Sequence, residues 1–310
     1  QTCALPICDA SGYPNRPIKL MIPFAPGGGT DIVGRAVGEK LSQALGQSVV
    51  VENKAGANGT IGANLVARSP ADGHSLCMFT ASHSVNVSLQ GAKLPYNLLR
   101  DFAPISLGTT APLFLAVHHA LPAKDFKEFT ALAKARAGKL SYGSSGTGSS
   151  LHLGGVMLDK ATGNETLHVP YKGGGQAMTD VLGGNIPLVY TAIAGAIPHV
   201  KSGKLMPIAV SSSKRASSLP DVATFVENGV ADFEASSWVG LLAPAKTPRA
   251  ILTRLNTELN AVLNDPEVKE RLNGMGITAA PGTPENFGAE LTRDLAKYGT
   301  VVKAAGIKAE

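Results

Sequence analysis

The sequence contains few cysteines and few aromatic residues. Its 310 residues include three cysteines and one tryptophan, and aromatic residues make up 5%. Cys3 and Cys8 could close a short N-terminal loop if that segment is native. If it is not, only Cys77 remains and no intrachain disulfide can form. There is no Cys cluster, and the seven histidines show no H-E-x-x-H pattern, so we expect no metal.

The chain also lacks a long hydrophobic segment and a run of basic residues. The longest apolar stretch, residues 186–197, is shorter than the ~18 residues that span a bilayer. The net charge of +5 is thinly spread, and basic residues do not alternate with aromatic ones, which argues against nucleic-acid binding. A chain that is 44% hydrophobic and 16% charged is typical of a globular protein. We expect one or two domains and a weak attraction for anionic solutes.

The N-terminal segment lacks the features of an intact secretory signal. Residues 1–10 have neither a basic region nor an apolar core. Residues 1–7 also match one reading frame of a widely used sequencing adapter. We therefore expect residues 1–12 to be a non-native or disordered segment, and the native signal peptide to have been lost or replaced.

Short apolar strands alternate with amphipathic helices along the rest of the chain, as in parallel-sheet α/β folds. Predicted strands are residues 18–24, 48–52, 75–80, 140–143, 167–170, 186–190, 205–211 and 239–243. Predicted helices are residues 30–45, 60–68, 125–137, 149–161, 176–182, 248–263, 265–273 and 285–304, with another ending near residue 202. The last three helices need a sheet to cover, and the first set of strands is the natural one.

This order predicts two α/β lobes joined by a two-segment hinge. Lobe 1 comprises residues 13–119 and 237–310, and lobe 2 comprises residues 120–236. The chain crosses between them near residues 117–121 and returns near residues 236–243. The cleft between the lobes is the expected ligand site.

Two loops of small residues, one in each lobe, connect a strand to a helix at residues 24–31 and 142–150. Glycines let a ligand approach the main chain, and the helix N-terminus adds free N–H donors and a partial positive charge. Hydroxyl groups are added by Thr30, Ser144, Ser145, Thr147 and Ser149. Neither loop contains Lys or Arg, so neutral dipoles would hold an anion reversibly. Facing loops could hold two carboxylates, or one carboxylate and another polar group.

Other interpretations of these loops remain open. Either loop could be an ordinary β–α turn in which Thr30 or Ser149 caps the helix. A dinucleotide fingerprint fails at Ile32, and a phosphate P-loop lacks its lysine. A serine hydrolase using Ser145 or Ser149 lacks the nucleophile spacing and an evident base. Two such loops, one in each lobe, favour binding over catalysis.

The sequence closely resembles the Bug-type substrate-binding receptors of tripartite tricarboxylate transporters from Tyr13 to near its end. The family opening "YPxxPIxLxxPFxPGGxxDxxxR" matches residues 13–35, and "VENxxGAxGxxG" matches residues 51–62. Further matches are "PADG" at 70–73, "LPY…DFxPI" at 94–105, "SxGxGSxxHL" at 144–153, "VPYKG" at 169–173 and "GLLAPAxTP" at 240–248. One departure is Ala223-Thr224, where members often have Pro-Thr.

The resemblance implies a type II periplasmic binding-protein fold, a periplasmic location, no catalysis and no cofactor. It implies that a small di-, tri- or aromatic carboxylate is delivered to a membrane permease of the tripartite tricarboxylate type. The first loop would bind a carboxylate through Phe24, Pro26, Gly27, Gly28, Thr30 and Asp31. The Asp31 backbone N–H would face the ligand, and its side chain would favour the helix start. A second polar end would meet Ser144, Gly146, Thr147 and Ser149, with Ser82, Tyr190 and Thr191 as further lining. We expect a monomer; a ligand sensor for a signalling partner is an alternative role.

Overall fold

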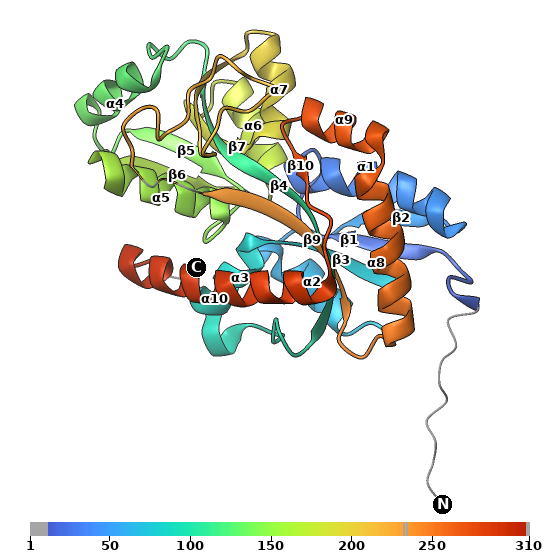
Figure 1. The fold of residues 1–310 in the computed structure, drawn as a ribbon. Helices are drawn as coiled ribbons and strands as arrows, with labels where there is room; N and C mark the ends of the chain where they lie inside the picture. Colours follow the sequence, from blue (N-terminus) through green and yellow to red (C-terminus); the bar gives the residue numbers. More distant parts are fainter. Residues whose placement is uncertain (1–11, 232, 234, 308–310) are drawn as a thin grey trace, which may run out of the picture.

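The computed structural model describes residues 12–231, 233 and 235–307 (Figure 1). The predicted non-native segment, except for Gly12, lies outside these residues. The described chain forms two α/β lobes connected by two long neighbouring strands. Within the described part, no helix is long and apolar enough to cross a membrane.

Lobe 1 is a mixed sheet covered by helices on both faces. Its strand order is β2 (Val49–Asn53), β1 (Ile18–Ile22), β3 (Ser75–Thr80), β9 (Ser236–Pro244) and β4 (Phe102–His118). One face packs against α1 (Gly29–Leu45) and α8 (Arg249–Asn264), and the other against α2 (Thr60–Ala67), α3 (Ala81–Gln90) and α10 (Pro284–Ala305). The C-terminal helices thus cover the sheet of the first lobe, as predicted. Smaller elements are η2 (Ala57–Gly59), η3 (Gly91–Lys93), α9 (Pro266–Gly274) and β10 (Thr278–Ala279).

The first strand–helix unit shows how the sequence places a helix start at the sheet edge. Val33, Val37 and Leu41 recur every four residues and are buried on the face of α1 that meets β1. A Cβ at Gly34 would lie 2.5 Å from Ile22 Cδ1, so glycine lets the helix approach the strand closely. Because β1 is parallel to β2 and β3, the N-terminus of α1 lies at the carboxyl edge of these strands.

Lobe 2 repeats this design on a smaller sheet. Its strand order is β6 (Thr166–Pro170), β5 (Leu140–Ser144), β7 (Leu188–Ala192) and the second half of β4, with β8 (Leu205–Val210) also paired to β4. One face packs against α4 (Phe126–Ala135) and α5 (Ser150–Thr162), and the other against α6 (Gly174–Leu182) and α7 (Ile193–Lys201).

Strand β4 belongs to both lobes and forms one connection of the hinge. Residues up to Pro112 pair with β9, whereas residues from Leu113 onward pair with β7 and β8. The change of partners therefore lies about five residues before the predicted crossing at 117–121. Strand β9 returns at Ser236, directly opposite Pro112, so the two connections are neighbours. The lobe boundaries after residues 119 and 236 remain a prediction.

Candidate functional site

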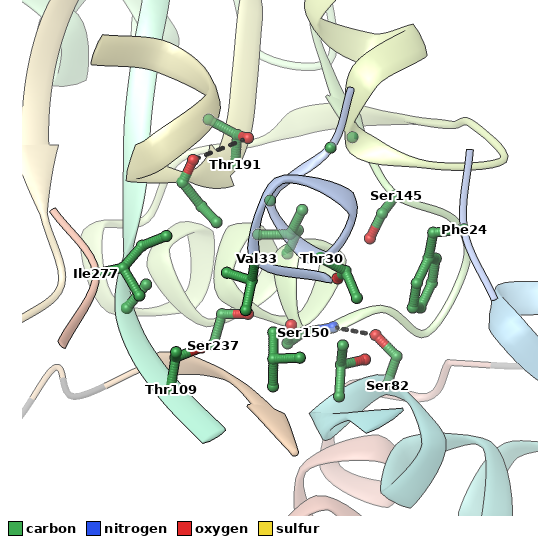
Figure 2. A pocket seen from close by; sticks show the side chains of 18 residues that line it. Phe24, Thr30, Val33, Ser82, Thr109, Ser145, Ser150, Thr191, Ser237 and Ile277 are labelled. Atoms are coloured by element: carbon green, nitrogen blue, oxygen red, sulfur yellow. Dashed lines mark hydrogen bonds between the residues drawn. The ribbon is translucent and has the colours of Figure 1, made fainter. Parts of the chain in front are cut away.

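A cavity of about 50 Å³ lies between the lobes beside the hinge strands (Figure 2). Its lining residues come from both lobes and are Phe24, Gly28, Gly29, Thr30, Val33, Thr80, Ser82, Thr109, Ala111, Ser145, Ser150, Leu151, Gly174, Thr191, Ala192, Ser237, Val239 and Ile277. None of these described lining residues carries a charged side chain. The space is therefore walled by main chain, hydroxyl groups and apolar side chains.

Five helices begin at this cavity. Their first residues or N-caps contribute Gly29 of α1, Thr80 of α3, Ser150 of α5, Gly174 of α6 and Ala192 of α7. A helix N-terminus presents unsatisfied N–H groups and about half a positive charge. The five dipoles together give the cavity a positive potential without a basic side chain, which suits an anion.

The hinge side of the cavity is largely apolar. Val33 and Ile277 point into it beside Thr109 and Ser237 in Figure 2. Ala111 and Val239, on the hinge strands β4 and β9, complete this wall. A ligand with a negative end at the helix starts can therefore place a hydrocarbon body against the hinge.

The first turn of α6 packs directly against the β1–α1 loop across the seam between the lobes. Ala25 N donates to Lys172 O at 3.3 Å. A Cβ at Gly28 would lie 3.5 Å from Gly175 N and 3.6 Å from Gly174 N. Residues 173–175 were not among the site residues predicted from the sequence. The signal was present, because a third run of glycines follows a strand and enters a helix there.

Three of the predicted first-loop residues, Phe24, Gly28 and Thr30, line the cavity, whereas Pro26, Gly27 and Asp31 do not. Asp31 is buried and its carboxylate accepts hydrogen bonds from Gly27 N (3.0 Å), Arg35 Nε (3.0 Å) and Asn53 Nδ2 (2.9 Å). Burial alone would raise the pKa of Asp31, but these hydrogen bonds outweigh burial and lower the pKa. The ionised side chain thus holds the loop against the start of α1.

In the second loop, the cavity is lined by Ser145 and Ser150 instead of the predicted neighbours Ser144 and Ser149. Ser144 and Ser149 are fully buried within lobe 2. Gly146 N donates to Ser144 Oγ at 3.2 Å, and Ser149 Oγ caps α5 by accepting from His152 N at 3.1 Å. The predicted residues Gly146 and Thr147 line a neighbouring groove. The hydroxyls of Ser144 and Ser149 thus stabilise the loop that places Ser145 and Ser150 at the cavity.

Of the three remaining predicted residues, Thr191 and Ser82 line the cavity and Tyr190 does not. Thr191 lines the cavity, whereas the preceding Tyr190 points into the lobe 2 core, 5.0 Å from the Tyr142 ring centroid. Ser82 also lines the cavity, and its Oγ accepts from Ser150 N at 3.4 Å (Figure 2). This bond joins the first turns of α3 and α5 across the two lobes.

A serine–histidine pair exists but is not placed for catalysis. Ser144 Oγ lies 2.6 Å from His168 Nε2, and the His168 and His152 rings stack with centroids 3.8 Å apart. Burial and the neighbouring His152 lower the pKa of His168 to about 3. Because Ser144 is fully buried, a substrate in the cavity cannot reach its hydroxyl. The pair instead stabilises the second loop.

Two α/β lobes around a cleft lined by helix starts define a two-lobed ligand-binding protein. The model of the tripartite tricarboxylate transporter family receptor matches residues 33–307, and the chain belongs to this family. BugT from Bordetella pertussis is 34% identical over 301 residues, covering 97% of this chain and 92% of BugT.

Solved structures of similar proteins share the fold. The periplasmic binding protein BugD is 36% identical, with a TM-score of 0.92 over 96% of this chain and all of that chain. R. palustris Rpa4515, solved with adipate, is 32% identical, with a TM-score of 0.92 over 96% of this chain and 99% of that one. These similarities confirm the predicted family and fold.

Proposed function

We propose that this protein is a periplasmic receptor that reversibly binds a small organic carboxylate between its lobes and delivers it to a membrane permease of the tripartite tricarboxylate type. One observation carries the binding proposal: five helices begin around a cavity whose described lining residues are all uncharged. The adipate bound to Rpa4515 supports a carboxylate ligand. The compartment and the permease rest on family membership.

The electrostatics suit reversible capture. Five helix N-termini, at about half a charge each, present roughly +2.5 in total, enough to balance one or two carboxylates. This charge is spread over fixed backbone dipoles, so binding needs no reorganisation of a flexible basic side chain. A salt bridge to Lys or Arg is replaced by several main-chain hydrogen bonds that break as the lobes separate.

We assign one ligand carboxylate to the gap between α1 and α6. Its oxygens would accept from the backbone at Gly29 and Thr30 on lobe 1 and at Gly174 on lobe 2, beside the Phe24 ring. The hydroxyls of Ser82, Ser145 and Thr191 would complete the polar contacts. The ligand body would lie toward the apolar wall at the hinge. Pro26, Gly27 and Asp31 would act by shaping the loop.

A ligand held by both lobes favours the closed arrangement over the open one. Binding shifts the equilibrium only by the difference between its contacts in the two states. Contacts from α1 and α6 together exist only when the lobes meet, so the ligand stabilises the closed form that the permease recognises. This cycle requires no chemical step, and we assign the protein no catalytic activity.

Substitution of Gly28 tests the site. Its backbone is extended, with φ −80° and ψ 167°, so other residues fit this conformation. In Gly28→Asp the new carboxylate would lie on the first turn of α6 and take the place of the ligand's charge. Gly28→Ala adds a methyl group that meets only ordinary van der Waals contacts. We expect the aspartate variant to lose carboxylate binding and the alanine variant to retain it.

The measurement is a thermal-shift screen of the wild type with adipate and other di-, tri- and aromatic carboxylates, followed by calorimetry of the best ligand with both variants. Unchanged affinity in Gly28→Asp would place the site elsewhere. Failure of every carboxylate to bind the wild type would refute the proposed function.

A further inference from the structure

A second depression, a groove of about 580 Å³, crosses the seam outside the ligand cavity. Lobe 1 contributes residues of η2, α3 and η3. Lobe 2 contributes the second loop, the end of β6 with the β6–α6 connection, and the start of α6. The groove is lined by Ala57, Asn58, Asn86, Leu89, Gln90, Lys93, Gly146, Thr147, Pro170, Tyr171, Lys172 and Gln176. It is therefore complete only while the lobes are together.

The charges of this groove are all positive. Lys93 from lobe 1 and Lys172 from lobe 2 are exposed, and no Asp or Glu is among the described lining residues. Neither lysine side chain forms an ion pair or hydrogen bond with any residue that the structure describes. Their positive charges are free to meet carboxylates from outside, one from each wall.

A hydrogen-bonded pair of asparagines, Asn58 and Asn86, lies in the lobe 1 wall of the groove. Asn86 Nδ2 donates to Asn58 O (2.9 Å) and Thr60 Oγ1 (3.2 Å). This orients the Asn86 amide so that its Oδ1 accepts a hydrogen bond from Asn58 Nδ2 at 2.9 Å. This chain of bonds fixes the Asn58 amide and leaves its Oδ1 buried without a hydrogen bond among the described residues. A Cβ at Gly146 would lie 3.7 Å from this oxygen, which places it at the seam. This oxygen is closed to solvent while the lobes are together, so the Asn58–Asn86 pair acts by fixing the lobe 1 wall of the groove.

We propose that this groove docks an acidic peptide segment of the partner protein and thereby recognises the closed form. Carboxylates of the segment would meet Lys93 on the lobe 1 wall and Lys172 on the lobe 2 wall. A groove of about 580 Å³ suits a few residues rather than a whole domain. This inference rests on the proposed function, because it names the surface through which the loaded receptor is recognised.

The probe is a fluorescein-labelled decapeptide of alternating glutamate and glycine, measured by anisotropy with and without the best carboxylate of the screen. Lys93→Glu/Lys172→Glu reverses both groove charges. Lys127→Glu/Lys134→Glu, on the exposed surface of α4, changes the net charge equally and is the matched control. We expect the groove variant to weaken peptide binding about tenfold or more and the control by less than about threefold. Carboxylate affinity should be unchanged in both.

The dependence of peptide affinity on closing of the two lobes gives a second measurement. Peptide affinity should rise when the carboxylate is present, because the groove needs both lobes. Equal losses in the two double variants would reduce the effect to net charge and overturn the proposal. A peptide affinity that is the same with and without the carboxylate would also overturn the proposal. A second carboxylate site that is present in the wild type and lost in the groove variant would do the same. If no carboxylate binds, the proposed function fails, while the two double variants still report on the groove.

Discussion

Replacing Gly175 by alanine places a methyl group on the surface where the lobes meet. The Cβ would lie within 3.0 Å of Pro26 O, a distance that real Cβ atoms essentially never show, and 3.2 Å from Gly27 C and Gly28 N. All three atoms are backbone, so no side chain can rotate away. Ordinary contact begins near 3.4 Å. The lobes must therefore separate by at least about 0.4 Å at this point.

The expected cost follows from this geometry. Overpacking a fitted contact costs about 1–3 kcal/mol, which here falls on the closed form alone. Because apparent affinity scales with the population of the binding-competent state, Kd should rise about 5- to 150-fold. Alanine has a higher helix propensity than glycine by about 1 kcal/mol, so the ligand-free protein should be no less stable.

Calorimetry with the best carboxylate and thermal melts of the ligand-free protein separate these effects. Gly274→Ala is the control, because this glycine lies in the last turn of α9 with no atom within 4 Å of the added methyl group. We expect weaker binding for Gly175→Ala but not for Gly274→Ala, and an unchanged or higher melting temperature for both variants. Wild-type affinity in this variant would refute the inference that ligand binding brings these backbones together.

Two further predictions concern residues behind the cavity. Asp31→Ala leaves the three donors from Gly27, Arg35 and Asn53 without their acceptor; urea titration should show a loss of about 1–3 kcal/mol, and calorimetry weaker carboxylate binding. Unchanged stability would contradict the role of Asp31 in holding the loop. Burial lowers the pKa of His83 from 6.5 to about 4. Between these two values the unfolded chain binds a proton at His83 and the folded protein does not, so acidification favours unfolding. His83 should lower stability by about 2 kcal/mol from pH 7 to pH 5, and His168, whose pKa is lowered to about 3, should lower it by about the same amount. Urea titration should therefore show a total loss of about 4 kcal/mol, and a flat profile would contradict the two neutral imidazoles.

The first strand–helix unit was predictable because one local pattern specifies it. Val33, Val37 and Leu41 recur at helical spacing, and Gly46 ends α1 in the left-handed conformation, as its place in the sequence indicates. The structure begins this helix one residue before the predicted start. The same periodicity located α8, α9 and α10 to within one residue at each end.

Helix α3 was not predicted, because it buries polar residues whose partners are distant in sequence. Ser82, His83, Ser84 and Asn86 are all buried. Asn86 is satisfied by Asn58, 28 residues earlier, and the His83 ring packs against Phe79 and Phe24. A sequence pattern without an apolar stripe gives no sign of such a helix.

The hinge strand β4 and the details of the loops were missed for different reasons. Pro104, Gly108 and Pro112 interrupt β4, and two of its irregularities fall between residues 104 and 109. In the second loop the sequence favoured Ser144 and Ser149, but the fold turns Ser145 and Ser150 to the cavity. Which of two adjacent hydroxyls faces a ligand depends on strand alternation and loop twist, which composition does not specify.

The most direct test of anion binding by main-chain dipoles is a crystal structure of the protein with the best carboxylate of the screen. We predict that ligand oxygens lie about 2.9 Å from backbone nitrogens in the first turns of both α1 and α6, with no Lys or Arg side chain in contact. A carboxylate paired with a basic side chain, or bound to one lobe alone with the seam open, would contradict this account.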